Sequence, residues 1–167
     1  MKPHSRIALA GPPFSGKTAV GRRLARMLEL EPVDLDREIE AGAGRSIPEI
    51  FRDRGEEGFR KLEAAALDRA LRRDGVVIAL GGGALLDPDC RRRVLRLCTV
   101  FTLWASEEET VSRWEQGGRP LAPTPQALRL LLRKRRRHYL SLPRRVDTTG
   151  RTPEEVCAEI AGMVGAG

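Results

Sequence analysis

The chain has 167 residues, 41% of them hydrophobic, which suffices for one globular domain with a sizeable core. No apolar run approaches the ~20 residues of a membrane span, and the run after the basic N-terminus is too short for a signal peptide. The net charge of +7 suggests nucleic-acid binding. The arginines, however, are spread along nearly every helical segment, and the aromatic residues, 4% of the chain, do not alternate with them as a surface for base stacking would require. Three cysteines without metal-type spacing indicate free thiols in a reducing compartment. We expect one domain over residues 1–167 in the cytoplasm, with no membrane or nucleic-acid partner.

Hydrophobic periodicity predicts five short strands that alternate with helices. The strands are expected at 6–10, 32–34, 76–80, 98–103 and 145–147. The helices are expected at 17–29, 36–43, 47–72, 88–96, 107–115, 126–141 and 153–164. Such alternation favours βαβ units, which form a parallel sheet with helices on both faces. The prediction is therefore a three-layer α/β/α domain whose core spans about 5–165.

The segment GPPFSGKT, which follows the first strand, fits the phosphate-loop pattern G-x-x-x-x-G-K-[ST]. In this pattern Lys17 reaches the β- and γ-phosphates of a nucleotide, and the Thr18 hydroxyl is positioned for Mg²⁺. A glycine turn that merely joins strand to helix is the alternative, but a strand before the pattern and an amphipathic helix after it favour a nucleoside triphosphate. The predicted nucleotide-binding residues of this segment are Gly11, Pro12, Pro13, Phe14, Ser15, Gly16, Lys17, Thr18 and Ala19.

Two carboxylates, Asp34 and Asp36, lie two residues apart at the predicted end of the second strand. Side chains two apart in a strand project to the same side, and ligands bind off the carboxyl ends of strands in open α/β sheets. One carboxylate suits Mg²⁺ through a water, and the other suits proton abstraction from an acceptor hydroxyl. The alternative is a helix N-cap, a position that Asp36 could occupy.

Three glycines, Gly81, Gly82 and Gly83, follow the third strand, where many phosphate-loop enzymes carry a metal-binding acid. Such a loop lets the backbone approach a ligand closely, although a simple flexible turn is the alternative. Arg60 lies at the edge of the apolar face of helix 47–72, one turn before Glu63. Its position fits either a surface salt bridge with Glu63 or a ligand contact.

The basic run at 133–137 looks like a solvated helix face, but the helical phase separates its members. Leu128, Leu132 and Tyr139 define the inward stripe, and Arg135 falls on it. A guanidinium on the buried side needs an anion, because an unpaired buried charge costs several kcal/mol. We therefore predict that Arg135 faces a ligand and that its neighbours in the run are solvated.

The stretch 116–125 is rich in glycine and proline and is predicted to be a mobile surface segment, with a plain connection as the alternative. A lid over about 114–126 would bring Arg119 to a γ-phosphate, where an arginine stabilises charge on the transferring group. We expect Arg119 to have no partner until that phosphate is present.

In order and spacing these motifs resemble those of the shikimate kinases, from about residue 6 to 164. The matching pieces are GPPFSGKTAVGRRLA, VDLDREIE, SIPEIFRDRGEEGFRKLE, LGGGALL, RPLA, RKRRRHYL and VDTTGRTPEEV. The resemblance implies a nucleoside-monophosphate-kinase-like fold with five parallel strands in the order 2-3-1-4-5. It also implies a monomeric enzyme of aromatic amino acid biosynthesis that uses Mg²⁺ and transfers the γ-phosphate of ATP to the 3-hydroxyl of shikimate.

The resemblance also implies roles for individual residues. Asp36 would bind the shikimate hydroxyls and assist proton loss, and Asp34 would help to hold the metal. Arg60 and Arg135 would bind the substrate carboxylate, and the substrate-binding segment would span about 36–62. The remaining assignments are Gly81, Gly82 and Gly83 in the substrate pocket, Arg119 in the lid, and Arg113 and Pro153 on either side of the adenine. The chain departs from the family pattern in reading R-P-L-A in the lid and in carrying Pro12 and Pro13.

Two other classes remain as alternatives. The first is another small-molecule kinase of this superfamily, acting on gluconate or a nucleotide. The second is a nucleotide-binding switch or a nucleic-acid-associated NTPase, which would hydrolyse nucleotide without an acceptor. Release of ADP that depends on the acceptor distinguishes these classes.

Overall fold

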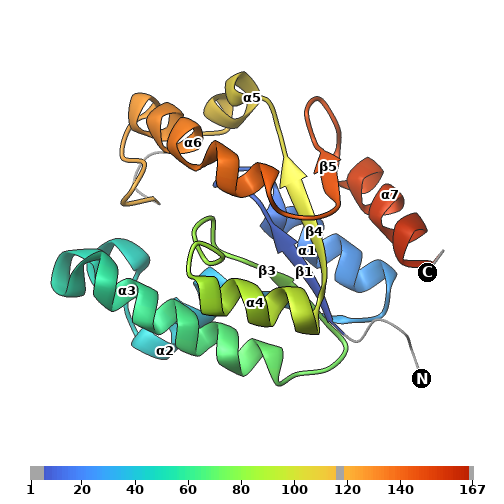
Figure 1. The fold of residues 1–167 in the computed structure, drawn as a ribbon, viewed down its shortest axis with the longest axis horizontal. Coiled ribbons are helices and arrows are strands. Elements are labelled where there is room, and N and C mark those ends of the chain that lie inside the picture. The colour runs from blue at the N-terminus through green and yellow to red at the C-terminus, as the bar shows by residue number, and fades with distance from the viewer. Residues whose placement is uncertain (1–5, 116–118, 166–167) are drawn as a thin grey trace.

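The computed structural model describes residues 6–115 and 119–165, in which strands and helices alternate along the chain (Figure 1). The strands are β1 (Arg6–Ala10), β2 (Glu31–Asp34), β3 (Val76–Ala79), β4 (Thr99–Trp104) and β5 (Arg145–Asp147). The helices are α1 (Lys17–Met27), α2 (Leu35–Ala43), α3 (Ile47–Leu71), α4 (Pro88–Leu97), α5 (Glu107–Ser112), α6 (Pro125–Leu140) and α7 (Pro153–Gly165). Each predicted element is present, with shifts of a few residues at its ends.

The strands form one parallel sheet in the order β2-β3-β1-β4-β5. Central strand β1 pairs on both sides, and its Ile7 lies opposite Val77 of β3 and Thr99 of β4. This arrangement confirms the predicted fold class and strand order. It also brings the carboxyl ends of all strands to one edge, where ligands bind in sheets of this type.

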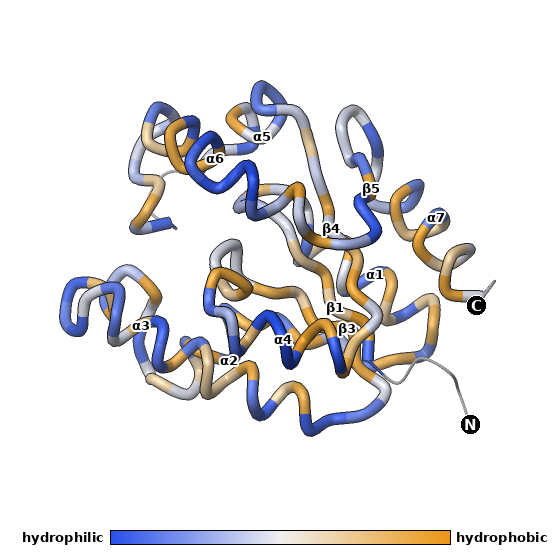
Figure 2. The backbone as a smooth tube through the Cα atoms, viewed as in Figure 1, coloured by the Kyte–Doolittle hydropathy of each residue, from blue (hydrophilic) through white to orange (hydrophobic). Residues whose placement is uncertain are grey.

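Helices cover both faces of the sheet and bury two separate apolar clusters (Figure 1). Alternate residues of β1 face opposite sides, so that Ala8 belongs to the cluster under α2, α3 and α4, while Ile7 belongs to the cluster under α1 and α7. The tube is predominantly hydrophobic through β1 and β3 and hydrophilic on outer turns of α3 and α6 (Figure 2). No helix among the described residues is long and apolar enough to cross a membrane.

Two predicted helices differ from the observed ones. The segment expected as one helix over 47–72 is interrupted at Gly55, whose φ of 65° and ψ of −176° are not helical. Glycine adopts this positive φ without a steric penalty. The segment 52–58 around it carries no apolar side chain, so the apolar pattern is also interrupted there. The helix expected at 107–115 ends at Ser112, so that Arg113 lies just beyond its last turn. The three cysteines are free, as predicted.

A third, smaller apolar cluster lies on the side of α5 and α6, away from the two faces of the central sheet. Its buried members are Ala122, Leu128 and Leu132, and partly buried side chains including Trp114 and Phe14 pack against them. Since Phe14 belongs to the loop after β1, this cluster joins that loop to the segment before α6.

Candidate active site

The phosphate loop follows β1 and curls at glycines with positive φ. Gly11 has a φ of 136°, and a Cβ there would lie 2.2 Å from the Leu103 carbonyl oxygen, so only glycine fits. Gly16, with a φ of 93°, directly precedes α1. The loop therefore wraps the N-terminus of α1, the geometry in which backbone N–H groups and the helix dipole favour phosphate.

Lys17 is buried within this loop. Its Nζ donates hydrogen bonds to the carbonyl oxygens of Gly11 (2.9 Å) and Pro12 (2.6 Å). Burial lowers the pKa of Lys17 to about 7, and the positive charge of Arg119 contributes in the same direction. A bound anion would favour the charged ammonium, so the neutral amine form of Lys17 would take up a proton when an anion binds.

Thr18 and Asp34 lie together next to the loop. The Thr18 hydroxyl donates to Asp34 Oδ2 at 2.9 Å, and Asp34 Oδ1 accepts from the Arg37 backbone N–H at 3.4 Å as the N-cap of α2. The described residues contain no cluster of three or more His, Cys, Asp or Glu side chains, so a metal here needs further ligands from a nucleotide and water. Mg²⁺ is held in this way, through one or two protein oxygens plus phosphates, and this pair fits it.

The expected geometry of the two aspartates is wrong. Strand β2 ends at Asp34 and α2 begins at Leu35, so Asp36 lies in the first turn of the helix rather than in the strand. The argument that both carboxylates project from one strand therefore does not apply, and the N-cap is Asp34 rather than Asp36. Asp36 nevertheless faces the same end of the sheet, where it lines a pocket.

That pocket brings together all the residues predicted to bind an acceptor. Its charged and glycine members come from α2, α3, the loop after β3, the segment before α6, and α6 itself. They are Asp36, Arg60, Glu63, Gly81, Gly82, Gly83, Arg119 and Arg135. The apolar side chains of Ile47, Phe51 and Phe59 form another wall, and Pro13 of the phosphate loop borders it. The acceptor pocket is therefore both charged and partly apolar, and it adjoins the phosphate loop.

Arg60 satisfies both of the interpretations left open by its sequence position. Its Nη1 donates to Glu63 at 2.6 Å and its Nη2 to Glu56 at 3.3 Å, while the guanidinium lines the acceptor pocket. Glu63 is 4% exposed, and burial raises its pKa against the opposing effect of Arg60. Glu63 was missed as a pocket residue, although its spacing from Phe59 and Leu67 on the buried face of α3 was a usable signal.

The three glycines lie in close contact with side chains. A Cβ on Gly81 would lie 2.5 Å from Glu63 Oε1, and one on Gly83 would lie 2.5 Å from Arg60 Nη2. A Cβ on Gly82 would lie 2.9 Å from Pro13 Cδ. The loop thus lets the acceptor pocket and the phosphate loop meet without intervening side chains.

Arg135 lies on the inward stripe of α6, as its helical phase predicts. It is 8% exposed and shares the buried face with Leu128, Leu132 and Tyr139, whereas its neighbour Arg136 is exposed. Tyr139 fixes this face to the glycine loop, because its hydroxyl donates to the Gly82 carbonyl at 2.7 Å. None of the carboxylates in the described part of the chain forms an ion pair with Arg135.

The expectation that Arg119 has no partner before nucleotide binds is wrong. Its Nη1 donates to Asp36 Oδ2 at 2.6 Å, and its guanidinium lies 5.7 Å from the centroid of the Phe14 ring. The pairing arises because the segment at 119–122 lies over the acceptor pocket. Part of the predicted lid, residues 116–118, lies outside the described residues.

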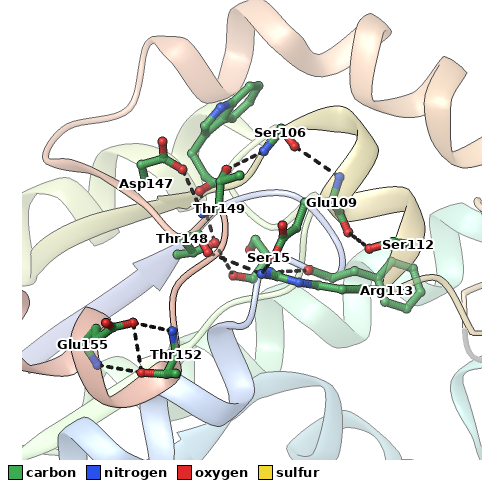
Figure 3. Close-up of polar contacts among 12 residues, drawn as sticks. Ser15, Ser106, Glu109, Ser112, Arg113, Asp147, Thr148, Thr149, Thr152 and Glu155 are labelled. Atoms are coloured by element: carbon green, nitrogen blue, oxygen red, sulfur yellow. Dashed lines mark hydrogen bonds and ion pairs between the residues drawn. The ribbon is translucent and has the colours of Figure 1, made fainter.

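Arg113 and Pro153, the predicted adenine pair, line one groove on the other side of the phosphate loop, together with Gly16. Arg113 donates to the backbone carbonyls of Phe14 and Thr148, each at 3.3 Å (Figure 3). These bonds hold the guanidinium between the phosphate loop and the loop after β5. The groove adjoins the phosphate loop through Ser15 and Gly16.

The parallel sheet has this strand order, a phosphate loop at its carboxyl edge and a charged pocket beside that loop. Together these features define a phosphate-loop kinase of small molecules. The family model described as shikimate kinase matches residues 13–164. The chain belongs to the shikimate kinase family.

Relatives and solved structures agree with this assignment. The shikimate kinase of Thermus thermophilus is 41% identical over 164 residues, which cover 95% of this chain and 89% of that protein. The shikimate kinase of Salinispora tropica is 46% identical, covering 93% and 95%. The shikimate kinase of Acinetobacter baumannii, solved in complex with shikimate, superposes with a TM-score of 0.93 at 32% identity, covering 99% of this chain and 95% of that one.

Proposed function

We propose that this chain transfers the γ-phosphate of ATP to the 3-hydroxyl of shikimate, giving shikimate 3-phosphate and ADP in the cytoplasm, as a monomer. The observation that carries the proposal is the acceptor pocket, in which Arg60 and Arg135 converge on one side and Asp36 lies toward the phosphate loop. Family membership supports the same reaction, and the Acinetobacter baumannii relative supports shikimate as the acceptor.

The two arginines bind the acceptor carboxylate. Arg60 is oriented by Glu63, which occupies its Nη1, and Arg135 projects from α6 among apolar neighbours that exclude water. Guanidinium groups bind carboxylates through two parallel hydrogen bonds, which fix orientation as well as position. The ring of shikimate then lies against Phe51 and Phe59, with a hydroxyl directed to Asp36.

Asp36 accepts or orients the proton of the attacking hydroxyl. Phosphoryl transfer requires little covalent chemistry from the protein, so positioning and electrostatic stabilisation dominate. Lys17 and Arg119 offset the charge that develops on the transferring group and on the leaving oxygen. Arg119 occupies Oδ2 of Asp36 in the structure, and in this proposal the acceptor hydroxyl takes the place of the guanidinium there before transfer.

Thr18 and Asp34 would hold Mg²⁺, with Asp34 acting through a water. When bound, the ion supplies charge neutralisation between the β- and γ-phosphates. The chain's own contribution is to place the Thr18 hydroxyl and the Asp34 carboxylate together, a geometry fixed by the N-cap of α2.

The test is release of ADP measured with a panel of acceptors: shikimate, quinate, gluconate and a nucleoside monophosphate. We expect turnover with shikimate well above the other three and little release of ADP without an acceptor. The Lys17→Met variant serves as the control for contaminating ATPases. Acceptor-independent release of ADP as fast as release with shikimate would contradict the proposal, and so would a preference for gluconate or the nucleotide.

A further inference from the structure

Phe14 is a bulky residue with a left-handed backbone in the middle of the phosphate loop. Its φ is 59°, a region that large side chains rarely adopt and that persists only where the surroundings enforce it. Glycine would satisfy the same backbone without strain, as it does at Gly16. Contacts of the Phe14 side chain that glycine could not make are therefore the interactions that would offset this strain.

The side chain of Phe14 is partly buried against a cluster formed by the segment before α6 and by α6 itself. The buried members of this cluster are Ala122, Leu128 and Leu132, and Trp114 packs against the same cluster. Trp114 in turn donates through Nε1 to the Ala122 carbonyl at 2.9 Å. The ring thus fixes the phosphate loop to the part of the chain that carries Arg119.

The guanidinium of Arg119 is held from two directions. Asp36 Oδ2 accepts from Nη1 at 2.6 Å, and the Phe14 ring lies beneath the guanidinium carbon, 5.7 Å from centroid to carbon. That distance is within the ~6 Å at which the quadrupole of an aromatic ring attracts a cation. When an acceptor hydroxyl takes the place of the guanidinium at Asp36, the ring is the contact that remains.

We propose that Phe14 is a positioning residue that keeps Arg119 at the phosphate loop after Asp36 has released it. The inference rests on the proposed function, in which Arg119 stabilises the transferring phosphoryl group. It assigns the Phe14 side chain a role separate from that of its backbone, which belongs to the phosphate cradle. An aliphatic side chain would fill the same apolar cluster, but only an aromatic ring also attracts the guanidinium.

The experiment compares Phe14→Leu, Phe14→Met and Phe14→Tyr with the unaltered chain in steady-state transfer to shikimate. Leu and Met keep the apolar packing, so we expect kcat to fall roughly three- to thirtyfold, the range of a cation–aromatic contact, with KM for shikimate within about twofold. Tyrosine keeps the ring and should restore kcat to within about twofold. Leu130→Ala, a truncation on α6 at a side chain that is 67% exposed, is the matched control and should not change kcat.

A double-mutant cycle with Arg119→Ala separates positioning from a structural role. In the Arg119→Ala background, Phe14→Leu should lower kcat by less than about twofold, because the residue to be positioned is absent. An equal loss in both backgrounds would overturn the proposal, since Phe14 would then act on the loop itself. Unchanged kcat in both the Leu and Met variants would overturn it as well.

A measurement of stability, which needs no catalytic turnover, tests the role of Phe14 separately from the proposed function. The same cycle measured on the thermal midpoint of the substrate-free protein should show that Phe14→Leu destabilises the chain more when Arg119 is present than when it is absent. If the unaltered chain does not phosphorylate shikimate, the proposed function fails while this coupling still tests the contact. If the cycle shows no coupling in the midpoint or in kcat, the proposal about Phe14 fails while the proposed function stands.

Discussion

Substitution of Arg135 and of Arg136 by alanine gives the sharpest test of the acceptor site. The two residues are adjacent in α6 and carry the same charge, so a general effect of basic residues would act on both. They differ in environment, because Arg135 is 8% exposed and lines the acceptor pocket, whereas Arg136 is exposed and does not line it. Any difference in acceptor binding between the two variants therefore shows which of the two side chains faces the pocket.

The structure sets the expected magnitudes. If Arg135 binds the acceptor carboxylate, its loss removes a partly desolvated charge-assisted interaction worth about 1.5–3 kcal/mol. This corresponds to roughly tenfold to 150-fold weaker binding of shikimate. Arg136 has no contact with the pocket, so its substitution should change stability and binding by no more than about 0.5 kcal/mol, which is a factor of about two.

The assay is calorimetric titration of shikimate into each variant, with titration of ADP as the control for the phosphate loop. We expect Arg135→Ala to weaken shikimate binding alone, and Arg136→Ala to match the unaltered chain in both titrations. Similar effects of the two substitutions would refute the assignment of Arg135 to the carboxylate. A large effect of Arg136→Ala with a silent Arg135→Ala would refute the helix phase itself.

Four further predictions concern Lys17, Asp36 and Gly83. The pKa of Lys17 is about 7 in the empty loop, so binding of a nucleotide at pH 8 should be accompanied by uptake of protons. The uptake is measured from the dependence of the calorimetric binding enthalpy on the ionisation enthalpy of the buffer. Most of it should be lost in the Lys17→Arg variant and in a titration of the unaltered chain at pH 6. The same shift should make the ligand-free protein more stable as pH rises from about 7 toward 10.5, because the unfolded chain binds more protons there. Asp36→Asn should lower kcat by about 100-fold or more in the ADP-release assay, with little change in KM for ATP. Gly83→Ala should raise KM for shikimate without a large change in thermal midpoint, since the added Cβ displaces only the flexible end of Arg60.

The fold could be predicted from the sequence because short apolar strands alternate with amphipathic helices, a pattern that few architectures accommodate. The interruption at Gly55 was missed, although the segment around it, 52–58, carries no apolar side chain and the buried residues Ile50 and Phe59 on its two sides are not in phase on one continuous helix. The end of α5 at Ser112 was missed because apolar periodicity does not locate a helix end to better than a few residues. Boundaries of this kind depend on backbone conformations that the hydrophobic pattern does not encode.

The candidate site was predictable to the extent that it depends on local order. Helical phase alone placed Arg135 on the inward face of α6, and the structure bears this out. The pair between Asp36 and Arg119 joins residues 83 positions apart, and no local pattern specifies that contact. From the sequence, Glu63 could be considered only as a partner of Arg60. Its close approach to Gly81 depends on the packing of α3 against the loop after β3, which no local pattern specifies.

The balance of charge in the acceptor pocket bears on which acceptor it fits. Three arginines, Arg60, Arg119 and Arg135, face two carboxylates, Asp36 and Glu63, which leaves an excess of one positive charge when both acids are ionised. An acceptor with a single carboxylate neutralises that excess, whereas the dianionic phosphate of a nucleoside monophosphate would leave a net negative charge among buried groups at appreciable cost.

Gluconate carries the same single charge as shikimate, so charge does not distinguish the two. The apolar wall of Ile47, Phe51 and Phe59 does, because these side chains carry no hydrogen-bonding groups. An open-chain polyol would bury hydroxyls against that wall without partners, which costs free energy for each one. A ring with one unsaturated, apolar edge avoids this penalty, and it keeps the carboxylate and the reacting hydroxyl on a rigid frame between Arg135 and Asp36.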